Sequence, residues 1–227
     1  MKKAVILLSG GLDSVTVANI ALQKYELYAL SFDYGQRHSV ELDFAKKIVQ
    51  KLGIKEHKIA KIDLEIFGNS SLTDKSMKVP KNQDVENKKD IPTTYVPARN
   101  TIFLSFALAY SEVLGATDIF IGANAVDYSN YPDCRPQFIS AFEKLANKAT
   151  ALETKFKIHA PLINLTKAQI IKTGLEFGVD YSMAHSCYDP VEKDAKFYAC
   201  GKCDSCLLRL NGFAKNNIPD PYPYLSS

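Results

Sequence analysis

The sequence predicts an α/β protein built on a doubly wound, mostly parallel sheet. Residues 4–8 form a continuous apolar run, which is typical of a strand buried on both faces of a parallel sheet. The first 62 residues alternate strand and helix patterns in the order β-α-β-α-β, and this order implies right-handed crossovers. Of the 227 residues, 46% are hydrophobic, which is enough to bury a full core.

Apolar spacing defines the other elements of the N-terminal half. It predicts a helix at 13–24 and strands at 27–32 and 55–62. Residues 40–52 separate charged from apolar side chains as an amphipathic helix does, and Gly53 stops that helix. The segment 69–87 is polar and has no periodicity, so we expect either a lid over a ligand or a disordered stretch.

The C-terminal half continues the alternation of helix and strand. The predicted elements are a helix at 99–114 ended by Gly115, a strand at 117–121, a helix at 137–152, a helix from a capping box at 166–169 to about 177, and a short helix at 204–214. The tail, 218–227, is rich in Pro and Tyr and is expected to be extended.

Charge and hydropathy exclude several classes of protein. The net charge of +3 is too small to indicate stable nucleic-acid binding, although it leaves room for a nucleotide-sized anion in a local pocket. No apolar run approaches the roughly 20 residues of a membrane span. We therefore expect a cytoplasmic protein without a membrane partner.

A glycine-rich turn at 9–14 joins the first strand to the first helix. Gly10 and Gly11 let the backbone approach an anion closely, and amides of the turn and of the new helix face that anion. Ser9 and Ser14 add hydroxyl donors, while Asp13 either binds Mg²⁺ or caps the helix. The spacing fits neither a Walker loop nor a dinucleotide fingerprint. The turn is thus either a phosphate site or a tight strand-to-helix turn.

Four of the five cysteines lie near the C-terminus and fit a closed, tetrahedral zinc site, because two overlapping C-x-x-C steps and one more thiol supply four ligands. The proposed ligands are Cys187, Cys200, Cys203 and Cys206. An iron–sulfur cluster is the alternative metal centre. His185 is either a substitute ligand or a core or solvated histidine. Cys134 stands apart, as a nucleophile or sulfur carrier or, alternatively, as a small residue lining a pocket.

Three polar segments should converge on the glycine-rich turn, because each follows a strand or opens a helix: 32–38, 95–100 and 131–135. They supply Arg for a carboxylate, Asp and amides for purine-like edges, and Tyr for stacking. Each segment alone could be ordinary loop structure, and Arg37 or His38 alone is more easily explained as solvated than as catalytic.

Ser-Gly-Gly-Leu-Asp-Ser at 9–14 resembles the PP-loop of the N-type ATP pyrophosphatases. The wider set of motifs is similar to the family of 7-cyano-7-deazaguanine synthases of queuosine biosynthesis. The matching motifs are Phe-Asp-Tyr-Gly-Gln-Arg-His, Val-Pro-Ala-Arg-Asn, Tyr-Pro-Asp-Cys-Arg-Pro, His-Ser-Cys-Tyr and Cys-Gly-Lys-Cys-Asp-Ser-Cys. The gap between Cys187 and Cys200 is longer than in that family's pattern, as a looped-out insertion would be.

The resemblance implies a Rossmann-like fold of the adenine nucleotide alpha hydrolase type and an ATP-dependent carbon–nitrogen ligase. The implied reaction converts 7-carboxy-7-deazaguanine and free ammonia to the nitrile through adenylated acid and amide intermediates. ATP would be bound by Leu8, Ser9, Gly10, Gly11, Leu12, Asp13, Ser14, Val15, Thr16, Val17, Ala18 and Lys167. The deazapurine acid would be bound by Tyr34, Gln36, Arg37, His38, Tyr95, Arg99, Asn100, Asp133 and Arg135.

Under this interpretation residues 1–180 form the ATP-binding domain and residues 181–227 a zinc-binding segment packed on it. The zinc is structural, one per chain, and Asp13 is a possible Mg²⁺ ligand. Lys167 either reaches a phosphate or is an exposed helix lysine. A homodimer is expected. The alternatives are another PP-loop enzyme, such as a tRNA thiolase or an ammonia-dependent amide ligase, and a zinc-ribbon module that binds nucleic acid.

Overall fold

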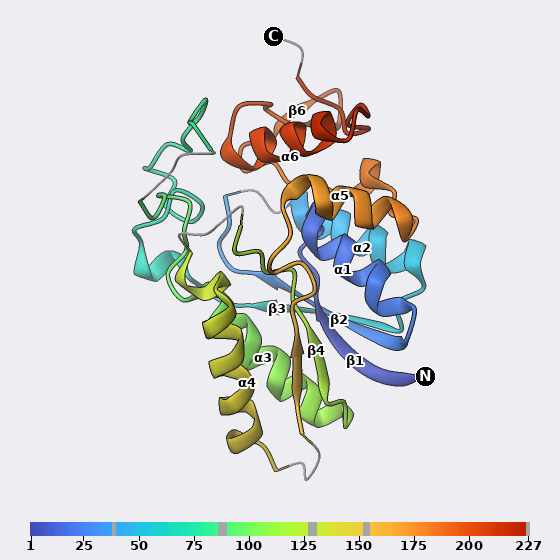
Figure 1. The fold of residues 1–227 in the computed structure, drawn as a ribbon. Helices are drawn as coiled ribbons and strands as arrows, with labels where there is room; N and C mark the ends of the chain where they lie inside the picture. Colours follow the sequence, from blue (N-terminus) through green and yellow to red (C-terminus); the bar gives the residue numbers. More distant parts are fainter. Residues whose placement is uncertain (38–39, 86–89, 127–130, 152–154, 226–227) are drawn as a thin grey trace.

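The computed structural model describes residues 1–37, 40–85, 90–126, 131–151 and 155–225. Its centre is a sheet of five parallel strands with the spatial order β3-β2-β1-β4-β5 (Figure 1). The strands are β1 (Lys2–Leu7), β2 (Tyr25–Asp33), β3 (Glu56–Lys61), β4 (Asp118–Phe120) and β5 (Lys157–His159). The predicted fold class, a doubly wound parallel sheet, is confirmed.

Helices cover both faces of the sheet (Figure 1). They are α1 (Leu12–Leu22), α2 (Val40–Leu52), α3 (Arg99–Leu114), α4 (Pro136–Ala149), α5 (Lys167–Glu176) and α6 (Asp204–Lys215). The alternation of β1 explains the two layers, since successive side chains of a strand point to opposite faces. Ala4 and Ile6 join the core with α1, α2 and α5, whereas Val5 and Leu7 join the core with α3 and α4.

The strand order reverses beside β1, because the chain moves outward through β2 and β3 and then returns to β4 on the other side. Ligands of open α/β sheets bind at such a switch point, outside the carboxyl ends of the strands. β1 and β4 end at Leu7 and Phe120, so the residues that follow them meet there. The topology thus places the glycine-rich turn, 9–14, at the binding edge.

Predicted helix ends are confirmed where local chemistry sets them. Thr166 and Gln169 form the reciprocal capping box at the start of α5. Gly115 caps α3 in the left-handed region, at φ 64°, and Gly53 after α2 has φ 63°. The sequence did not reveal β5, nor the antiparallel hairpin β6 (Val191–Lys193) and β7 (Lys196–Tyr198).

The C-terminal part holds α6, the β6–β7 hairpin, the 3-10 turn η3 (Tyr181–Met183) and the tail. Arg209 of α6 is buried and forms an ion pair with Asp220 at 2.7 Å. Tyr181 and Phe213 pack in the same core as α1 and α5. The division into residues 1–180 and 181–227 stays a prediction.

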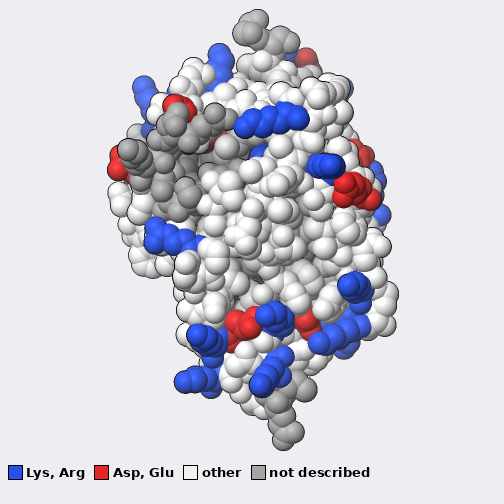
Figure 2. Space-filling model, viewed as in Figure 1, with Lys and Arg blue, Asp and Glu red and all other residues white. Residues whose placement is uncertain are grey.

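Two further 3-10 turns, η1 (Glu65–Phe67) and η2 (Pro132–Cys134), precede α3 and α4 in the chain. Among the described residues, no helix is both long and apolar enough to cross a membrane. On the face shown in Figure 2, acidic side chains lie among the basic ones, so this face carries no continuous field of one sign.

Candidate active site

The turn after β1 has a conformation that only glycine adopts easily. Gly10 has φ 87°, and a Cβ at this position would lie 2.5 Å from the carbonyl oxygen of Glu41 and 2.9 Å from the amide nitrogen of Ala45. The start of α2 is therefore packed directly against the turn. This contact limits how far the phosphate loop, residues 9–14, can move toward α2.

The phosphate loop is held by its own hydroxyls and by a distant serine. Ser9 and Ser14 lie with their Oγ atoms 3.2 Å apart, and Ser14 Oγ donates to the carbonyl of Gly11 at 3.0 Å. The amide of Leu12 donates to Ser186 Oγ at 3.2 Å. Helix α1 begins with Gly11 as its N-cap and has no side-chain cap. The first turn of α1 can thus offer amides and a positive dipole end to an anion.

Asp13 and Lys167 form an ion pair inside this loop region. Lys167 Nζ lies 2.7 Å and 2.9 Å from the two carboxylate oxygens of Asp13. Lys167 is 7% exposed, so the interpretation of a surface lysine is wrong. Because Gly11 is the N-cap, Asp13 does not cap α1, and that alternative is also wrong.

A pocket opens beside the phosphate loop. It is walled by the ends of β1, β2 and β4, the starts of α2 and α3, and the segment before α6. Predicted residues that line it are Leu8, Ser9, Gly11, Leu12, Asp13, Ser14, Tyr34, Gln36, Arg37, Arg99 and Asn100. The three polar segments therefore converge there in part, as the topology required.

Arg99 and Asn100 begin α3 at the pocket wall. Asn100 is tied to η2, since its backbone amide donates to Asp133 Oδ2 and its Nδ2 donates to the Asp133 carbonyl, both at 2.9 Å. Burial lowers the pKa of Arg99, but Tyr34, Asp133 and two further tyrosines more than offset this and raise it. Arg99 is therefore a fixed positive charge facing the pocket, suited to a carboxylate.

Gln36 and Arg37 line the pocket while bound to backbone. Gln36 Oε1 accepts from the amide of Tyr34 at 2.7 Å, so this side chain folds over its own turn. Arg37 donates to carbonyls of the segment 69–85, those of Ser71, Asp74 and Met77. Arg37 is thus neither simply solvated nor free, and plain disorder is wrong for 69–85. Whether this segment closes as a lid stays a prediction.

The remaining predicted residues lie outside the pocket wall. Tyr95 accepts from the amide of Ala98 at 3.1 Å, and Arg135 is exposed. Val15, Val17 and Ala18 are core side chains, and Thr16 bonds to Tyr181 OH at 2.8 Å. His38 lies outside the described residues.

Sequence reasoning missed several residues that line the pocket, among them Gly122 and Glu41. Gly122 follows β4, and a Cβ there would lie 3.1 Å from the amide nitrogen of Ser14. Glu41, in the first turn of α2, lines the pocket, and burial raises its pKa to about 7 although Arg99 opposes the shift. The signal for Glu41 was its place one turn after the polar segment 32–38, but it read as one charge on an amphipathic helix.

Cys134 lines the pocket and is a poor nucleophile. Burial, aided by Asp133, raises the pKa of its thiol to about 12. Asn100 Nδ2 donates to its sulfur at 3.3 Å. The interpretation as a small pocket-lining residue is thereby confirmed.

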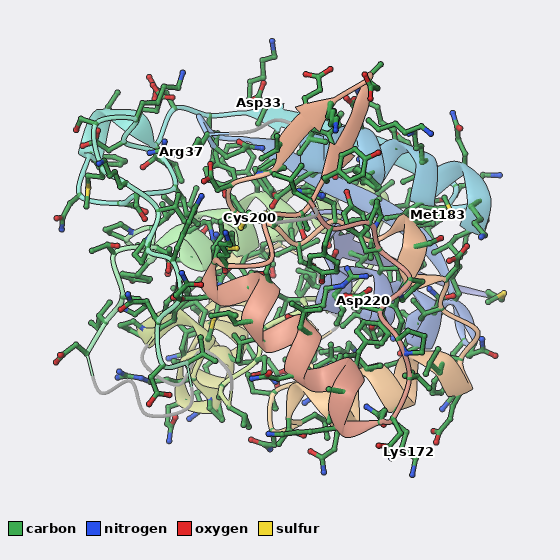
Figure 3. All side chains as sticks on the ribbon, turned by 90° about the horizontal axis from the view of Figure 1, so that it is seen from above. Asp33, Arg37, Lys172, Met183, Cys200 and Asp220 are labelled. Atoms are coloured by element: carbon green, nitrogen blue, oxygen red, sulfur yellow. The ribbon has the colours of Figure 1, made fainter. Side chains whose placement is uncertain are left out.

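The second candidate site is the cysteine cluster. The sulfurs of Cys187, Cys200, Cys203 and Cys206 are buried and all lie within 4.8 Å of one another. The Cys200 and Cys206 sulfurs are 4.0 Å apart, close to the about 3.8 Å between thiolates on tetrahedral zinc. Cys200 lies near the beginning of α6 in Figure 3. The long gap after Cys187 is the β6–β7 hairpin, which leaves the ligand geometry intact.

Backbone amides surround the sulfurs of the cluster. Asp189 and Cys200 donate to Cys187 Sγ at 3.3 and 3.2 Å, and Lys202 and Cys203 donate to Cys200 Sγ at 3.4 and 3.3 Å. Such N–H donors stabilise the charged thiolate form that binds metal. The donor set thus fits a structural zinc ion.

His185 is a core histidine rather than a fifth ligand. It is fully buried, and its Nδ1 lies 2.7 Å from Tyr222 OH. Its backbone amide donates to the carbonyl of Gly10 at 2.9 Å. Residues 185–187 therefore contact the phosphate loop at one end and enter the cysteine cluster at the other.

A parallel sheet with a glycine-rich loop at its switch point, joined to a four-cysteine cluster, defines a nucleotide-binding α/β protein of the PP-loop type. The chain matches the family described as Queuosine biosynthesis protein QueC over residues 3–217, and it belongs to that family.

Curated relatives extend the match over the whole chain. One from Desulfatibacillum aliphaticivorans, named 7-cyano-7-deazaguanine synthase, is 58% identical over 99% of this chain and 97% of its own length. One of the same name from Rickettsia felis is 55% identical over 99% of this chain and all of its own. The structure of NMN synthetase from Francisella tularensis shares the fold, with a TM-score of 0.51 and 19% identity over 96% of this chain and 78% of that one.

Proposed function

We propose that this chain is a 7-cyano-7-deazaguanine synthase, which consumes ATP and ammonia to convert 7-carboxy-7-deazaguanine to its nitrile. The observation that carries the proposal is the shared wall of one pocket, where the phosphate loop of residues 9–14 faces Arg99. The names of the curated relatives support the same activity. Family membership supports a role in queuosine biosynthesis.

The chemistry requires two adenylations, because the oxygens of a carboxylate and of an amide are both poor leaving groups. The acid first attacks the α-phosphorus of ATP and releases pyrophosphate, and ammonia then displaces AMP to give the amide. A second ATP adenylates the amide oxygen, and loss of AMP leaves the nitrile. Amides at the start of α1 would stabilise the pyrophosphate charge that develops in both adenylations.

The residues around the loop take complementary roles in this proposal. Arg99 would hold the substrate carboxylate, and Tyr34 would flank it. Lys167 would turn from Asp13 to a phosphate, which frees Asp13 to hold Mg²⁺ with the nucleotide. Mg²⁺ would supply charge neutralisation at the phosphates. The cysteine cluster would hold a structural zinc ion that takes no part in the steps.

We also propose free ammonia as the nitrogen donor, the cytoplasm as the compartment and a homodimer as the assembly. A four-thiol metal site requires reduced cysteines, which the cytoplasm maintains. Phe106 and Val113 lie seven residues apart on α3 and are 42% and 83% exposed, so this helix offers apolar side chains to a second copy. Light scattering of the wild type and of Val113→Glu measures the assembly.

Mass spectrometry of a reaction with the deazaguanine acid, ATP and ammonium tests the function. We expect the nitrile together with two AMP for each product. A reaction that stops at the amide identifies an amide ligase instead. The absence of AMP with this acid contradicts the assignment.

A further inference from the structure

Glu41 occupies a position at the junction of the two halves of the pocket. Its backbone carbonyl lies against Gly10 of the phosphate loop, and its side chain lines the pocket that Arg99 also lines. α2 and α3 pack on opposite faces of the sheet, so the two side chains approach this edge from different layers. A substrate whose carboxylate contacts Arg99 and whose adenylate lies on the loop therefore reacts beside Glu41.

Asp13 and Glu41 are the two carboxyl groups among the described residues that line this pocket, and they differ in their partners. Asp13 is bound by Lys167 through both oxygens. Within the described part of the chain, the Glu41 carboxyl has neither a hydrogen bond nor an ion pair within 4 Å. The Arg99 guanidinium influences it through space. The carboxyl of Glu41 is thus available to a ligand.

Two opposing influences act on the Glu41 carboxyl. Burial disfavours its charged form, and Arg99 on α3 favours that form less strongly. The resulting pKa of about 7 lets the group accept and release protons near neutral pH. The other titratable side chains that line the pocket are Asp13, Tyr34, Arg37, Tyr131, Cys134, His185, Cys187 and Tyr188.

The nitrogen steps of the proposed reaction each release a proton. When ammonia attacks the acyl adenylate, the C–N bond forms, AMP leaves with the electrons of the C–O bond, and the new nitrogen loses one proton. When the amide oxygen is adenylated, the amide nitrogen loses one of its two protons. In the last step AMP leaves with the electrons of the C–O bond, the second N–H proton is lost, and its electron pair becomes the third C–N bond. Ammonium must also lose a proton before it can attack. A base is thus required beside the substrate nitrogen.

We propose that Glu41 is the general base of the nitrogen steps, holding ammonium beside the substrate carbonyl and accepting the protons that the nitrogen loses. This inference rests on the proposed function. Glu41 takes no part in the first adenylation, because the attacking carboxylate oxygen of the acid carries no proton. The two half-reactions should therefore separate when Glu41 is changed.

The test is Glu41→Gln, with Asp43→Asn as the matched control. Asp43 lies in the same turn of α2, but its exposed carboxylate pairs with Lys46 outside the pocket. With the deazaguanine acid and ATP, Glu41→Gln should release the first pyrophosphate at nearly the wild-type rate. Nitrile formation at neutral pH should fall about 100-fold or more. Alkaline pH, where free ammonia prevails, should restore amide formation, and Asp43→Asn should behave as wild type throughout.

Each other outcome has a defined meaning. Nitrile formation by Glu41→Gln at the wild-type rate and neutral pH overturns the inference, as does an equal loss of pyrophosphate release. If the wild type forms no AMP from the acid, the proposed function itself has failed. If Glu41→Gln does not fold, Glu41→Ala with added formate replaces it, because a small carboxylate should restore nitrile formation in the cavity. Folded Glu41→Ala without such rescue also overturns the inference.

Discussion

The phosphate loop and the cysteine cluster both lie at the start of a helix, α1 and α6 respectively, yet their backbone and side-chain groups are arranged differently. In the cysteine cluster the amides of Lys202 and Cys203 are already bound to sulfur, and all four thiols are buried. In the phosphate loop, α1 starts without a side-chain cap beside an open pocket. The thiols of the first turn thus face one another in a buried cluster, whereas the second turn borders a pocket that a ligand can enter.

The basic residues Arg209 and Lys167 differ in the same way, in how fully their partners within the protein occupy them. Arg209, beside the cluster, is 3% exposed and is bound by Asp220 and by two backbone carbonyls, those of Ala184 and Tyr181. Lys167, beside the loop, pairs with Asp13, a partner that Mg²⁺ could take from it. All the contacts of Arg209 are thus made within the protein, whereas the partner of Lys167 is one that a ligand could replace.

Loss of a zinc ligand should have the largest effect. Cys203→Ser removes one of four thiolates at the N-cap of α6, and structural zinc contributes on the order of 10 kcal/mol to folding. We expect zinc content and soluble yield to fall together, as measured by atomic absorption and circular dichroism. Cys134→Ser, which changes a thiol outside the cluster, should keep its zinc. A metal-free Cys203→Ser protein with a native spectrum would refute the structural role.

A side chain at Gly10 should cost less stability but most of the activity. Gly10→Ala forces a methyl group against the Glu41 carbonyl and strains a backbone at φ 87°. Since a misplacement of about 1 Å can cost about 100-fold in rate, pyrophosphate release should fall at least that far. Gly53→Ala is the control, because Gly53 has φ 63° with no atom within 4 Å of the added carbon. Equal activity losses in the two variants would show that backbone strain alone is responsible.

Removal of the hydrogen bond between Leu12 and Ser186, which links the two regions, should have a moderate effect. Ser186→Ala removes the acceptor of the Leu12 amide, a contribution of about 1 kcal/mol, or roughly fivefold. The Michaelis constant for ATP should therefore rise roughly fivefold, with unchanged zinc content. Ser105→Ala, which alters an exposed hydroxyl on α3, should leave the constant unchanged. A normal ATP constant in Ser186→Ala would mean that the bond does not position the loop.

The last expected effect concerns the pH dependence of stability. Glu41 has an ordinary pKa of 4.5 when unfolded and about 7 when folded, so between these values the folded chain holds the extra proton. The contribution of Glu41 to the free energy of unfolding should therefore fall as pH rises through this window. Urea unfolding at about pH 5 and about pH 8 should show a flatter dependence in Glu41→Gln than in the wild type. Parallel curves would contradict the raised pKa.

The fold and the loop could be predicted because their signals are local. Each of these signals spans only a few residues. Examples are the apolar run of β1, the glycines at 10 and 11 and the capping box at Thr166. The strand β5 could not be predicted, because its three residues, Lys157–His159, become a strand only by pairing with β4. Elements fixed by partners far along the chain remain hidden in the sequence.

The candidate site could be predicted to about the same extent as the fold. Residue types predicted that Arg99 would lie at the pocket and that the four cysteines would cluster, and the structure places them so. Arg37 lines the pocket as well, but its bonds to the carbonyls of Ser71 and Asp74 could not be predicted, because tertiary structure sets them. Glu41 was missed for a related reason, since its altered acidity arises from burial that no sequence pattern records.

Three consecutive residues join the two regions: His185 binds the carbonyl of Gly10, Ser186 binds the amide of Leu12, and Cys187 belongs to the cysteine cluster. An oxidant that attacks the thiols would thereby loosen the nucleotide cradle without entering it. We expect the ATP affinity of a preparation to follow its zinc occupancy, so that metal supply governs catalytic competence even where every pocket residue is intact.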